Sequence, residues 1–326
     1  MLGVALLSRW HVHADEYAEE VKNNPYFEIK CVWDEENERG VRWGEELGVP
    51  FVDDLTSIFN DSTIQAVVVS TPTNLHTDII VQAAKNKKHI FTEKILAFTG
   101  DECTNIYEEV EKNGVSLMVS LPRLSSPYYL YAQKAVDEGL LGELTMARCR
   151  VAHNGAVPSE AFPEGWLPAH FYNKEACGGG ALIDLGAHPI YLCNRLLGKP
   201  ITVQAHFHYT YQKEVEDSAT IIVEYENGVL ANLETSFTSE DSPFLLELYG
   251  TKGCLYIKDE AIELRKNQTK KMISSLPAPL LTPMNQWAEE IVSGKKPSIT
   301  KEDIILLTTV NEAAYLSHHE KQQIGL

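Results

Sequence analysis

Short apolar runs alternate with amphipathic stretches over the first third of the chain. The apolar runs predict strands at residues 3–7, 27–33, 66–70, 89–92 and 116–121, and the amphipathic stretches predict helices at 14–23, 35–47, 55–60, 76–86 and 101–113. Strands this apolar, separated by helices, indicate a parallel sheet covered on both faces. We therefore predict a Rossmann-type, doubly wound α/β domain over residues 1–122.

The pattern changes after residue 122. A helix at 127–138 leads to a strand within GLLGELTMARCRV, and further runs with strand character occupy much of 202–258. Asn227 and Gly228 mark a hairpin turn between two of these runs, and helices at 284–293 and 301–321 close the chain. Consecutive strands with hairpin turns predict a second, α+β domain over residues 123–326, built on an open, mainly antiparallel sheet.

Length and charge narrow the class of function. The 326 residues suit two domains, and the formal net charge of −18 disfavours nucleic-acid or anionic-membrane partners, which require a cationic surface. The six cysteines include no CxxC pair, which is typical of reduced thiols. The apolar run at the amino terminus is too short for a signal peptide or a membrane span. We expect a cytoplasmic protein.

The loop after the first strand is the expected cofactor site. In a doubly wound sheet the first helix presents unpaired N–H groups to a pyrophosphate beyond the carboxyl ends of the strands. The GxGxxG fingerprint is absent, and Ser8, Trp10 and His11 occupy this loop instead. We assign these three residues to cofactor binding, with Ser8 also able to cap the helix. A loop without glycine approaches a phosphate less closely, so the pyrophosphate is held differently or more weakly.

Asp34 ends the second predicted strand. An acidic residue there can accept hydrogen bonds from the adenosine ribose and repel a 2′-phosphate, which favours NAD(H) over NADP(H). The equally weighted alternative is that Asp34 only caps the following helix.

His11 and His13 form an HVH pair beside Asp15 and Glu16, which raises the question of a metal. Residues two apart on a helix do not share a face, so we predict no metal site and interpret the group as a helix-entry cluster near the cofactor.

Several motifs occur in a specific order along nearly the whole chain. They are STPTNLH (70–76), HIFTEK (89–94), GGGALIDLGAHPIY (178–191), EDSATIIVEYENG and ELYGTKGCL. Together they resemble the family named for glucose-fructose oxidoreductase, inositol dehydrogenase and the rhizopine-catabolism protein MocA. The resemblance implies nicotinamide-dependent oxidation of a sugar or polyol hydroxyl, or the reverse reduction. The cofactor-site residues that we assign within the first two motifs are Ser70, Thr71, Pro72, Asn74, His76, Glu93 and Lys94.

The resemblance also implies catalytic roles. It places Lys94 beside the nicotinamide and the reacting oxygen, and Asp184 and His188 of a DxxxH motif at the substrate. Hydride transfer from an alcohol needs a base for the hydroxyl proton and a stabilising group for the alkoxide. We expect His188 to accept the proton and Lys94 to polarise the oxygen. Asp184, on the same helical face as His188, would orient the imidazole or bind a substrate hydroxyl.

Each of these assignments has a simpler alternative. Lys94 could be a solvated lysine paired with Glu93, because both residue types usually lie at the surface. His188 could be a buried, hydrogen-bonded histidine at a helix start. The glycines 178–180 could form only a flexible turn, although three glycines also let the backbone pass close to a ligand.

Further substrate contacts are expected from Arg123, Trp166, Tyr172 and Tyr191, with His170 near them. Two departures from the family pattern bear on the site. Ile95 replaces a proline that is often cis in the family, and we expect this change to alter where Lys94 sits. Tyr191 replaces an acidic residue, which concerns the choice of substrate rather than hydride transfer.

Aromatic side chains recur on the predicted strands of the second domain, namely Phe207, Tyr209, Tyr211, Tyr225 and Phe237. We expect them on an open face, which in the family mediates subunit association, so a homodimer or homotetramer is predicted. The alternative to an enzyme is a dinucleotide- or sugar-binding sensor of the same fold with weakened catalysis.

Overall fold

The computed structural model describes all residues 1–326. The chain forms two compact units, Met1–Leu121 with Leu281–Lys301 and Pro122–Leu280 with Glu302–Leu326. It leaves the first unit after Leu121 and returns to it for Leu281–Lys301, a segment that the sequence-based division left in the second domain. None of the helices combines the length and the hydropathy needed to cross a bilayer.

The return of the chain has a physical reason in helix α10 (Pro283–Ser293). Its Trp287 is fully buried, and the indole ring lies 5.1 Å from the ring of Phe27 and 5.7 Å from that of Phe91. Asn285 of the same helix accepts a 2.9 Å hydrogen bond from the amide of Asn24. Helix α10 therefore completes the apolar core on one face of the first sheet.

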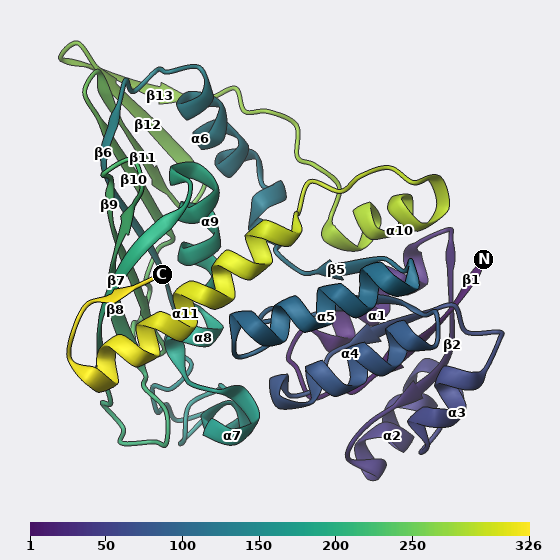
Figure 1. Cartoon of the computed structure of the whole chain (residues 1–326). Helices are drawn as coiled ribbons and strands as arrows, with labels where there is room; N and C mark the ends of the chain where they lie inside the picture. The colour runs from purple at the N-terminus through teal and green to yellow at the C-terminus, as the bar shows by residue number, and fades with distance from the viewer. The chain divides into compact units, whose positions relative to one another are not determined.

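The first unit contains a five-stranded parallel sheet with the order β2-β1-β3-β4-β5. The strands are β1 (Leu2–Leu7), β2 (Phe27–Trp33), β3 (Ala66–Val69), β4 (His89–Thr92) and β5 (Leu117–Val119). The helices are α1 (Ala14–Asn23), α2 (Asn37–Leu47), α3 (Leu55–Asn60), α4 (His76–Lys85) and α5 (Gly100–Asn113). Every residue of β3 is buried, as expected for a strand between two layers of helices (Figure 1). The doubly wound prediction is confirmed.

Strand register brings three loops together at the carboxyl edge of this sheet. Leu7 of β1 pairs with Val69 of β3, and Val69 pairs with Thr92 of β4. The next residues along each strand, Ser8 and Glu93 among them, therefore lie at neighbouring strand ends. The order of the strands reverses between β1 and β3, which is where ligands bind in open α/β sheets.

The second unit contains a nine-stranded sheet with the order β13-β12-β11-β10-β6-β9-β8-β7-β14. The strands are β6 (Leu144–Ala152), β7 (Pro200–His208), β8 (Ser218–Tyr225), β9 (Leu230–Ser236), β10 (Leu245–Gly250), β11 (Gly253–Lys258), β12 (Ala261–Lys266), β13 (Thr269–Ile273) and β14 (Ile324–Gly325). Only β6 and β9 pair in parallel. The mainly antiparallel prediction is confirmed, while β12, β13 and β14 were not anticipated.

Helices cover one face of this sheet. The α-helices of the unit are α6 (Pro127–Asp137), α7 (Lys174–Cys177), α8 (Ala181–Asp184), α9 (Ala187–Leu197) and α11 (Lys301–Glu320). Alternating side chains such as Val203 and Ala205 are buried, while Gln204 between them is exposed. Figure 1 shows α9 and α11 on the same side of the sheet, and no helix of this unit on the other.

The aromatic residues predicted for the open face are mostly on the covered face, so that prediction is wrong. Phe207 stacks on His318 of α11 with ring centroids 4.4 Å apart, and Tyr225 and Phe237 are fully buried. The period of two along a strand assigns them to the face with Val203 and Ala205. The open face instead presents aliphatic side chains, namely Met146, Ile222, Leu230 and Met272, each between 44% and 55% exposed.

Candidate functional site

Ser8 has the left-handed backbone that glycine favours. Its φ is 77°, its side chain is fully buried, and its hydroxyl accepts a 3.0 Å hydrogen bond from the backbone N–H of Trp10. Non-glycine residues adopt such a φ only rarely. The N-cap of α1 is His13, with no side-chain cap, so Ser8 does not cap this helix. The turn conformation is therefore formed without the expected glycine.

Asp34 is buried and fully occupied by hydrogen bonds. Its carboxylate accepts bonds from the backbone N–H groups of Arg9 and Glu36, both 2.8 Å, and two from the guanidinium of Arg39, 2.9 and 2.7 Å. The bond from Arg9 ties the end of β2 to the loop after β1. Asp34 thus links the first loop to the start of α2, and a ribose hydroxyl would have to replace one of these donors.

The surroundings of Arg39 are strongly acidic. Its guanidinium pairs with the carboxylates of Asp34, Glu35 and Glu36. Three carboxylates against one guanidinium leave a local formal charge of −2. Burial raises the pKa of Glu35, and the adjacent Asp34 adds to this effect. The second βα loop is therefore an anionic surface despite the arginine.

The residues after β3 are largely buried. Ser70 and Thr71 are at most 2% exposed, and the Thr71 hydroxyl has no hydrogen-bond partner in the protein. Buried hydroxyls are normally paired, so an unpartnered one beside the switch point suits a ligand with polar atoms. This position fits a dinucleotide. Pro72 is also buried, whereas Asn74 is exposed.

The ring of His76 contacts backbone carbonyl groups of two different loops. Its Nδ1 lies 3.0 Å from the carbonyl oxygen of Ile95 and 3.2 Å from that of Leu96, and its Nε2 lies 3.1 Å from that of Thr71. The ring is 1% exposed, and burial lowers its pKa. His76 therefore ties the loop after β4 to the loop after β3.

Glu93 and Lys94 follow β4 and are both buried, at 2% and 6% exposure. The alternative that Lys94 is a solvated surface lysine is therefore wrong. One oxygen of Glu93, Oε2, accepts a 2.9 Å bond from the backbone N–H of Lys94. The Lys94–Ile95 peptide bond is cis, although isoleucine stands where the family has proline.

The second oxygen of Glu93, Oε1, faces two histidines and a tyrosine. It lies 2.7 Å from Nδ1 of His13 and 3.5 Å from Nδ1 of His11, and the phenol of Tyr17 donates to it. The sequence-based argument against a metal assumed that His11 and His13 lie on a helix, where residues two apart do not share a face. It does not apply, because α1 begins only at Ala14 and the histidines lie in the turn before it. Their rings are 4.9 Å apart between centroids.

In the second unit, the glycine loop is held by the side chains of Glu216 and Tyr315, whose roles were not predicted from the sequence. Glu216 is 1% exposed and accepts bonds from the N–H groups of Gly180 (3.1 Å) and Leu182 (2.9 Å), while Tyr315 of α11 donates a 2.7 Å bond to it. A Cβ on Gly180 would lie 2.0 Å from the carbonyl oxygen of Glu216. The loop is therefore closely packed rather than a flexible turn. The only feature of the sequence that pointed to Glu216 was the EDSATI motif that contains it.

Asp184 and His188 lie on consecutive short helices, α8 and α9. The helical hydrogen bonding is interrupted between them, because the N–H of Gly186 bonds to the carbonyl of Ala181, five residues back. The prediction that the two side chains share a face of one regular helix is therefore not supported. Nδ1 of His188 lies 2.9 Å from the hydroxyl of Tyr191. Burial raises the pKa of Tyr191, so the phenol stays protonated.

The remaining substrate candidates have different surroundings. Arg123 lies 5.0 Å from the ring centroid of Phe244, and Trp166 is 43% exposed. Tyr172 is 8% exposed and its hydroxyl has no hydrogen-bond partner. Burial raises the pKa of Tyr172 to about 12. Of these residues, Tyr172 offers the clearest buried polar atom to a ligand.

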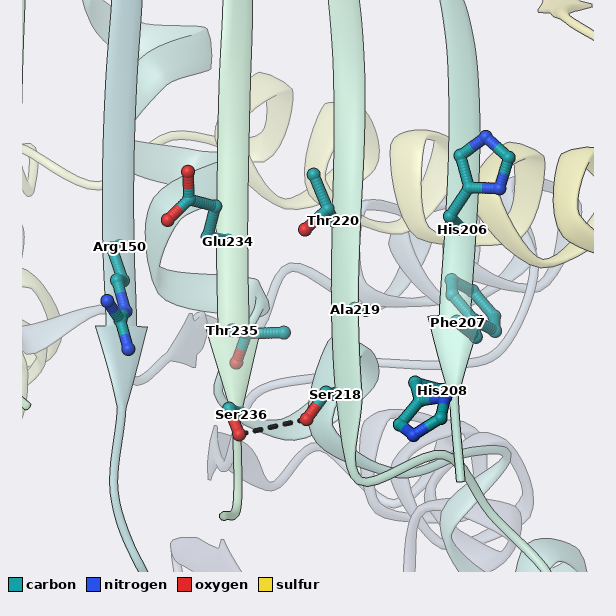
Figure 2. Close-up of a pocket in the computed structure, with 10 residues that line it drawn as sticks. All are labelled: Arg150, His206, Phe207, His208, Ser218, Ala219, Thr220, Glu234, Thr235 and Ser236. Atoms are coloured by element: carbon teal, nitrogen blue, oxygen red, sulfur yellow. Dashed lines mark hydrogen bonds between the residues drawn. The ribbon is translucent and has the colours of Figure 1, made fainter. Parts of the chain in front are cut away.

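The open face of the second sheet carries a shallow depression of about 430 Å³. Figure 2 shows side chains from β6 to β9 around it, with a 2.9 Å hydrogen bond between the hydroxyls of Ser218 and Ser236. Its polar lining consists of Arg150, His206, His208, Ser218, Thr220, Glu234, Thr235 and Ser236. It contains none of the site residues predicted from the sequence.

Comparison with known proteins places both parts of the chain in one family. Residues 8–121 match the profile of the oxidoreductase family with an NAD-binding Rossmann fold, and residues 129–256 match that of the GFO/IDH/MocA C-terminal domain. The chain is 27% identical over 323 residues to scyllo-inositol 2-dehydrogenase (NAD(+)) of Bacillus subtilis, covering 94% of this chain and 91% of the relative. It is 22% identical to myo-inositol 2-dehydrogenase of Thermotoga maritima, covering 86% of each chain.

Solved structures show the same fold over the whole length. GenD2 from gentamicin A biosynthesis, in complex with NAD, has a TM-score of 0.84 at 21% identity and covers 100% of this chain and 96% of its own. Levoglucosan dehydrogenase in complex with NADH and levoglucosan also has a TM-score of 0.84, at 20% identity, and covers 99% of each chain. The chain belongs to the Gfo/Idh/MocA family of NAD-binding oxidoreductases.

Proposed function

We propose that this chain is a dehydrogenase or reductase that transfers hydride between NAD(H) and a hydroxyl or carbonyl group of a sugar or polyol. The observation that carries the proposal is the burial of Lys94 at the carboxyl end of β4. Burying an ammonium group costs free energy, and a buried lysine at a ligand-binding edge therefore indicates a functional role. The relatives named above act on inositols, which supports the substrate class.

The proposed roles follow from the chemistry. Bound nicotinamide supplies the hydride acceptor or donor, and side chains of this chain must handle the proton. His188 accepts it from the substrate hydroxyl, which requires the tautomer whose Nδ1–H donates to the Tyr191 oxygen and whose Nε2 carries the lone pair. Lys94 stabilises the developing alkoxide. Asp184 and the unpartnered hydroxyl of Tyr172 bind substrate hydroxyls.

We assign further substrate contacts to Arg123, Trp166 and Tyr191. On the cofactor side, we assign contacts to the loop residues Ser8, Trp10 and His11, and to the residues that follow β3 and β4. These latter residues are Ser70, Thr71, Pro72, Asn74, His76, Glu93 and Lys94. The assignment of Thr71 has the strongest support, because its buried hydroxyl has no hydrogen-bond partner within the protein.

The cofactor preference proposed is NAD(H) over NADP(H). The arginine that would attract a 2′-phosphate, Arg39, is already paired with Asp34, Glu35 and Glu36. The net negative charge of this cluster repels an additional phosphate. Because the carboxylate of Asp34 is fully occupied, the more exposed Glu35 is the better acceptor for the ribose hydroxyls.

We propose a homodimer or homotetramer formed through the open face of the second sheet. This face combines exposed aliphatic side chains such as Ile222 and Leu230 with the polar depression of Figure 2. A contiguous apolar surface on a folded unit is a typical association surface. None of the six cysteines forms a disulfide bond, which supports a location in the reducing cytoplasm.

The test is turnover of an inositol and sugar panel with NAD by the wild type and by Lys94→Met. We expect the variant to lose turnover by at least a hundredfold while still binding NADH, whereas Lys85→Met on the exposed side of α4 retains turnover. Undiminished turnover by Lys94→Met contradicts the mechanism. If the wild type binds NADH but turns over no member of the panel, the sensor alternative is correct.

A further inference from the structure

His11, His13 and Glu93 form a compact group at the carboxyl edge of the first sheet. One ligand atom from each residue lies within 4.8 Å of those from the other two. We propose that these three side chains bind a divalent transition-metal ion, with Zn²⁺ as the representative metal. The proposal does not depend on hydride transfer, and either can fail without the other.

The chemistry of the three groups matches zinc. Two imidazoles and one carboxylate are a common protein ligand set for this ion, which leaves a further position for water or an exogenous ligand. Rigid segments supply all three groups. His11 and His13 lie in the turn tied to β3 by the bond from the His11 N–H to the Ser70 carbonyl (3.1 Å), and Glu93 directly follows β4.

The lone pairs converge on the same place. Nδ1 of His11 accepts a 3.3 Å bond from the backbone N–H of His13, so it carries a lone pair, yet it lies only 3.5 Å from the acceptor Oε1 of Glu93. Two acceptors this close are favourable when a proton or a cation lies near both. In the metal-free protein Nδ1–H of His13 and the hydroxyl of Tyr17 donate hydrogen bonds to Oε1. The incoming ion takes the place of the Nδ1 proton of His13, and the neutral ring that binds the ion carries its proton on Nε2.

Glu93 offers a fixed carboxylate to an ion. Its side chain is buried, its Oε2 is held by the backbone N–H of Lys94 (2.9 Å), and its Oε1 faces the two imidazoles. Access to the group is open through His13, whose side chain is 37% exposed. An ion can therefore reach the carboxylate without unfolding of the loop.

The position of the group distinguishes it from an ordinary surface HxH pair. The chain has a second such pair, His206 and His208 on β7, which lies on the exposed sheet face and forms no comparable cluster with a carboxylate. This second pair is a matched control, because it has the same spacing of imidazoles without a buried acidic partner.

The experiment is calorimetric titration of EDTA-treated, desalted protein with ZnCl₂. We expect one equivalent of Zn²⁺ per chain, and a loss of affinity of at least tenfold in His11→Asn, His13→Asn and Glu93→Gln. The control His206→Asn should bind as the wild type does. No stoichiometric binding, or binding lost only in His206→Asn, overturns the proposal.

A second measurement on the unaltered chain covers the case in which a variant fails to fold. Anomalous diffraction at the zinc edge, from crystals soaked in ZnCl₂, should place the ion among His11, His13 and Glu93. Zinc located elsewhere, or no ordered zinc, overturns the proposal.

Discussion

The phenol of Tyr315, which is half-buried, donates a 2.7 Å hydrogen bond to Oε1 of the buried Glu216. The same phenol lies 3.2 Å from the N–H of Gly180, so α11 and the loop before α8 are joined through one hydroxyl. Burial raises the pKa of Glu216, which makes its hydrogen-bond donors important to the folded state. This contact fixes the loop that leads to Asp184.

Tyr315→Phe should therefore destabilise the chain. Removing the hydroxyl leaves a buried carboxyl group short of one donor, which costs about 1–3 kcal/mol of unfolding free energy. Urea unfolding measures the loss. Tyr131→Phe on α6 is the control, since its hydroxyl has no protein partner, and it should change stability by less than about 0.5 kcal/mol. Equal stability of the two variants would show that the Glu216 contact contributes nothing.

Gly180→Ala should be more damaging than an alanine elsewhere in the second unit. The new Cβ would lie 2.0 Å from the carbonyl oxygen of Glu216, a backbone atom, so the loop must shift at a cost of roughly 1–3 kcal/mol or more. Gly325→Ala, whose Cβ would meet nothing within 4 Å, is the matched control. Thermal unfolding distinguishes them, and similar melting temperatures would contradict the close packing of the loop.

The stability of the chain should fall on mild acidification, and His89 should contribute. Nδ1 of His89 accepts a 3.0 Å bond from the N–H of Ser116, and burial lowers the pKa of this histidine. Below pH ~6.5 the unfolded chain takes up the proton first, so the free energy of unfolding falls toward the folded pKa, by at most about 1.4 kcal/mol per pH unit.

His89→Asn tests this, because an asparagine oxygen can accept the Ser116 bond without titrating. Urea unfolding between pH 7.5 and 5.5 should show a shallower fall in the variant. The exposed His319→Asn should follow the wild type. If His89→Asn and the wild type have the same slope, His89 does not contribute to the pH dependence.

Removal of charge around Arg39 should shift the cofactor preference. In the double variant Glu35→Gln/Glu36→Gln the guanidinium keeps only Asp34, and each lost carboxylate removes about 1 kcal/mol of repulsion toward a 2′-phosphate. Fluorescence titration should show the affinity for NADPH relative to NADH rising roughly tenfold or more. Glu28→Gln, at the other end of β2, should leave the ratio unchanged, and an unchanged ratio in the double variant refutes the electrostatic account.

A charge on the open sheet face should dissociate the proposed oligomer. Ile222 lies in the middle of β8 and is 48% exposed on this face, so Ile222→Glu would bury a carboxylate in a sheet-to-sheet interface that covers β8. Light scattering after gel filtration should give the monomer mass. Leu316→Glu, with 44% exposure on α11, should keep the wild-type mass. An oligomer retained by Ile222→Glu excludes this face.

Local patterns were sufficient to predict the architecture. The strand β2 and the helices α1 and α3 begin and end at the predicted residues, because their apolar spacing and flanking polar residues are unambiguous. The strands β12 and β13 were missed because alternating charged residues such as Glu263 and Lys270 hide the period of two. Sequence position alone also could not assign α10 to the first unit, since that depends on Trp287 meeting rings far away in the chain.

The candidate site was predictable only as far as motifs extend. Lys94, Asp184 and His188 were identified by resemblance, not by local pattern. The role of Asp34 as a fully bonded anchor depends on Arg39 and the backbone of Arg9, and no spacing rule encodes that combination. The Glu216–Tyr315 contact joins residues 99 positions apart, so only the folded chain shows it.

The passage of α10 into the first unit has a consequence for how such proteins diversify. A gene segment that ends at codon 121 encodes Phe27 and Phe91 but not the indole of Trp287 that packs against them. Recombination at that single junction would join the sheet of one parent to the α10 of another. The aromatic residues that meet there would then come from two sequences that had not evolved together. An intact cofactor-binding unit can be inherited only with junctions near residues 121, 280 and 301, so its substitutions must coevolve with a distant stretch of the reading frame.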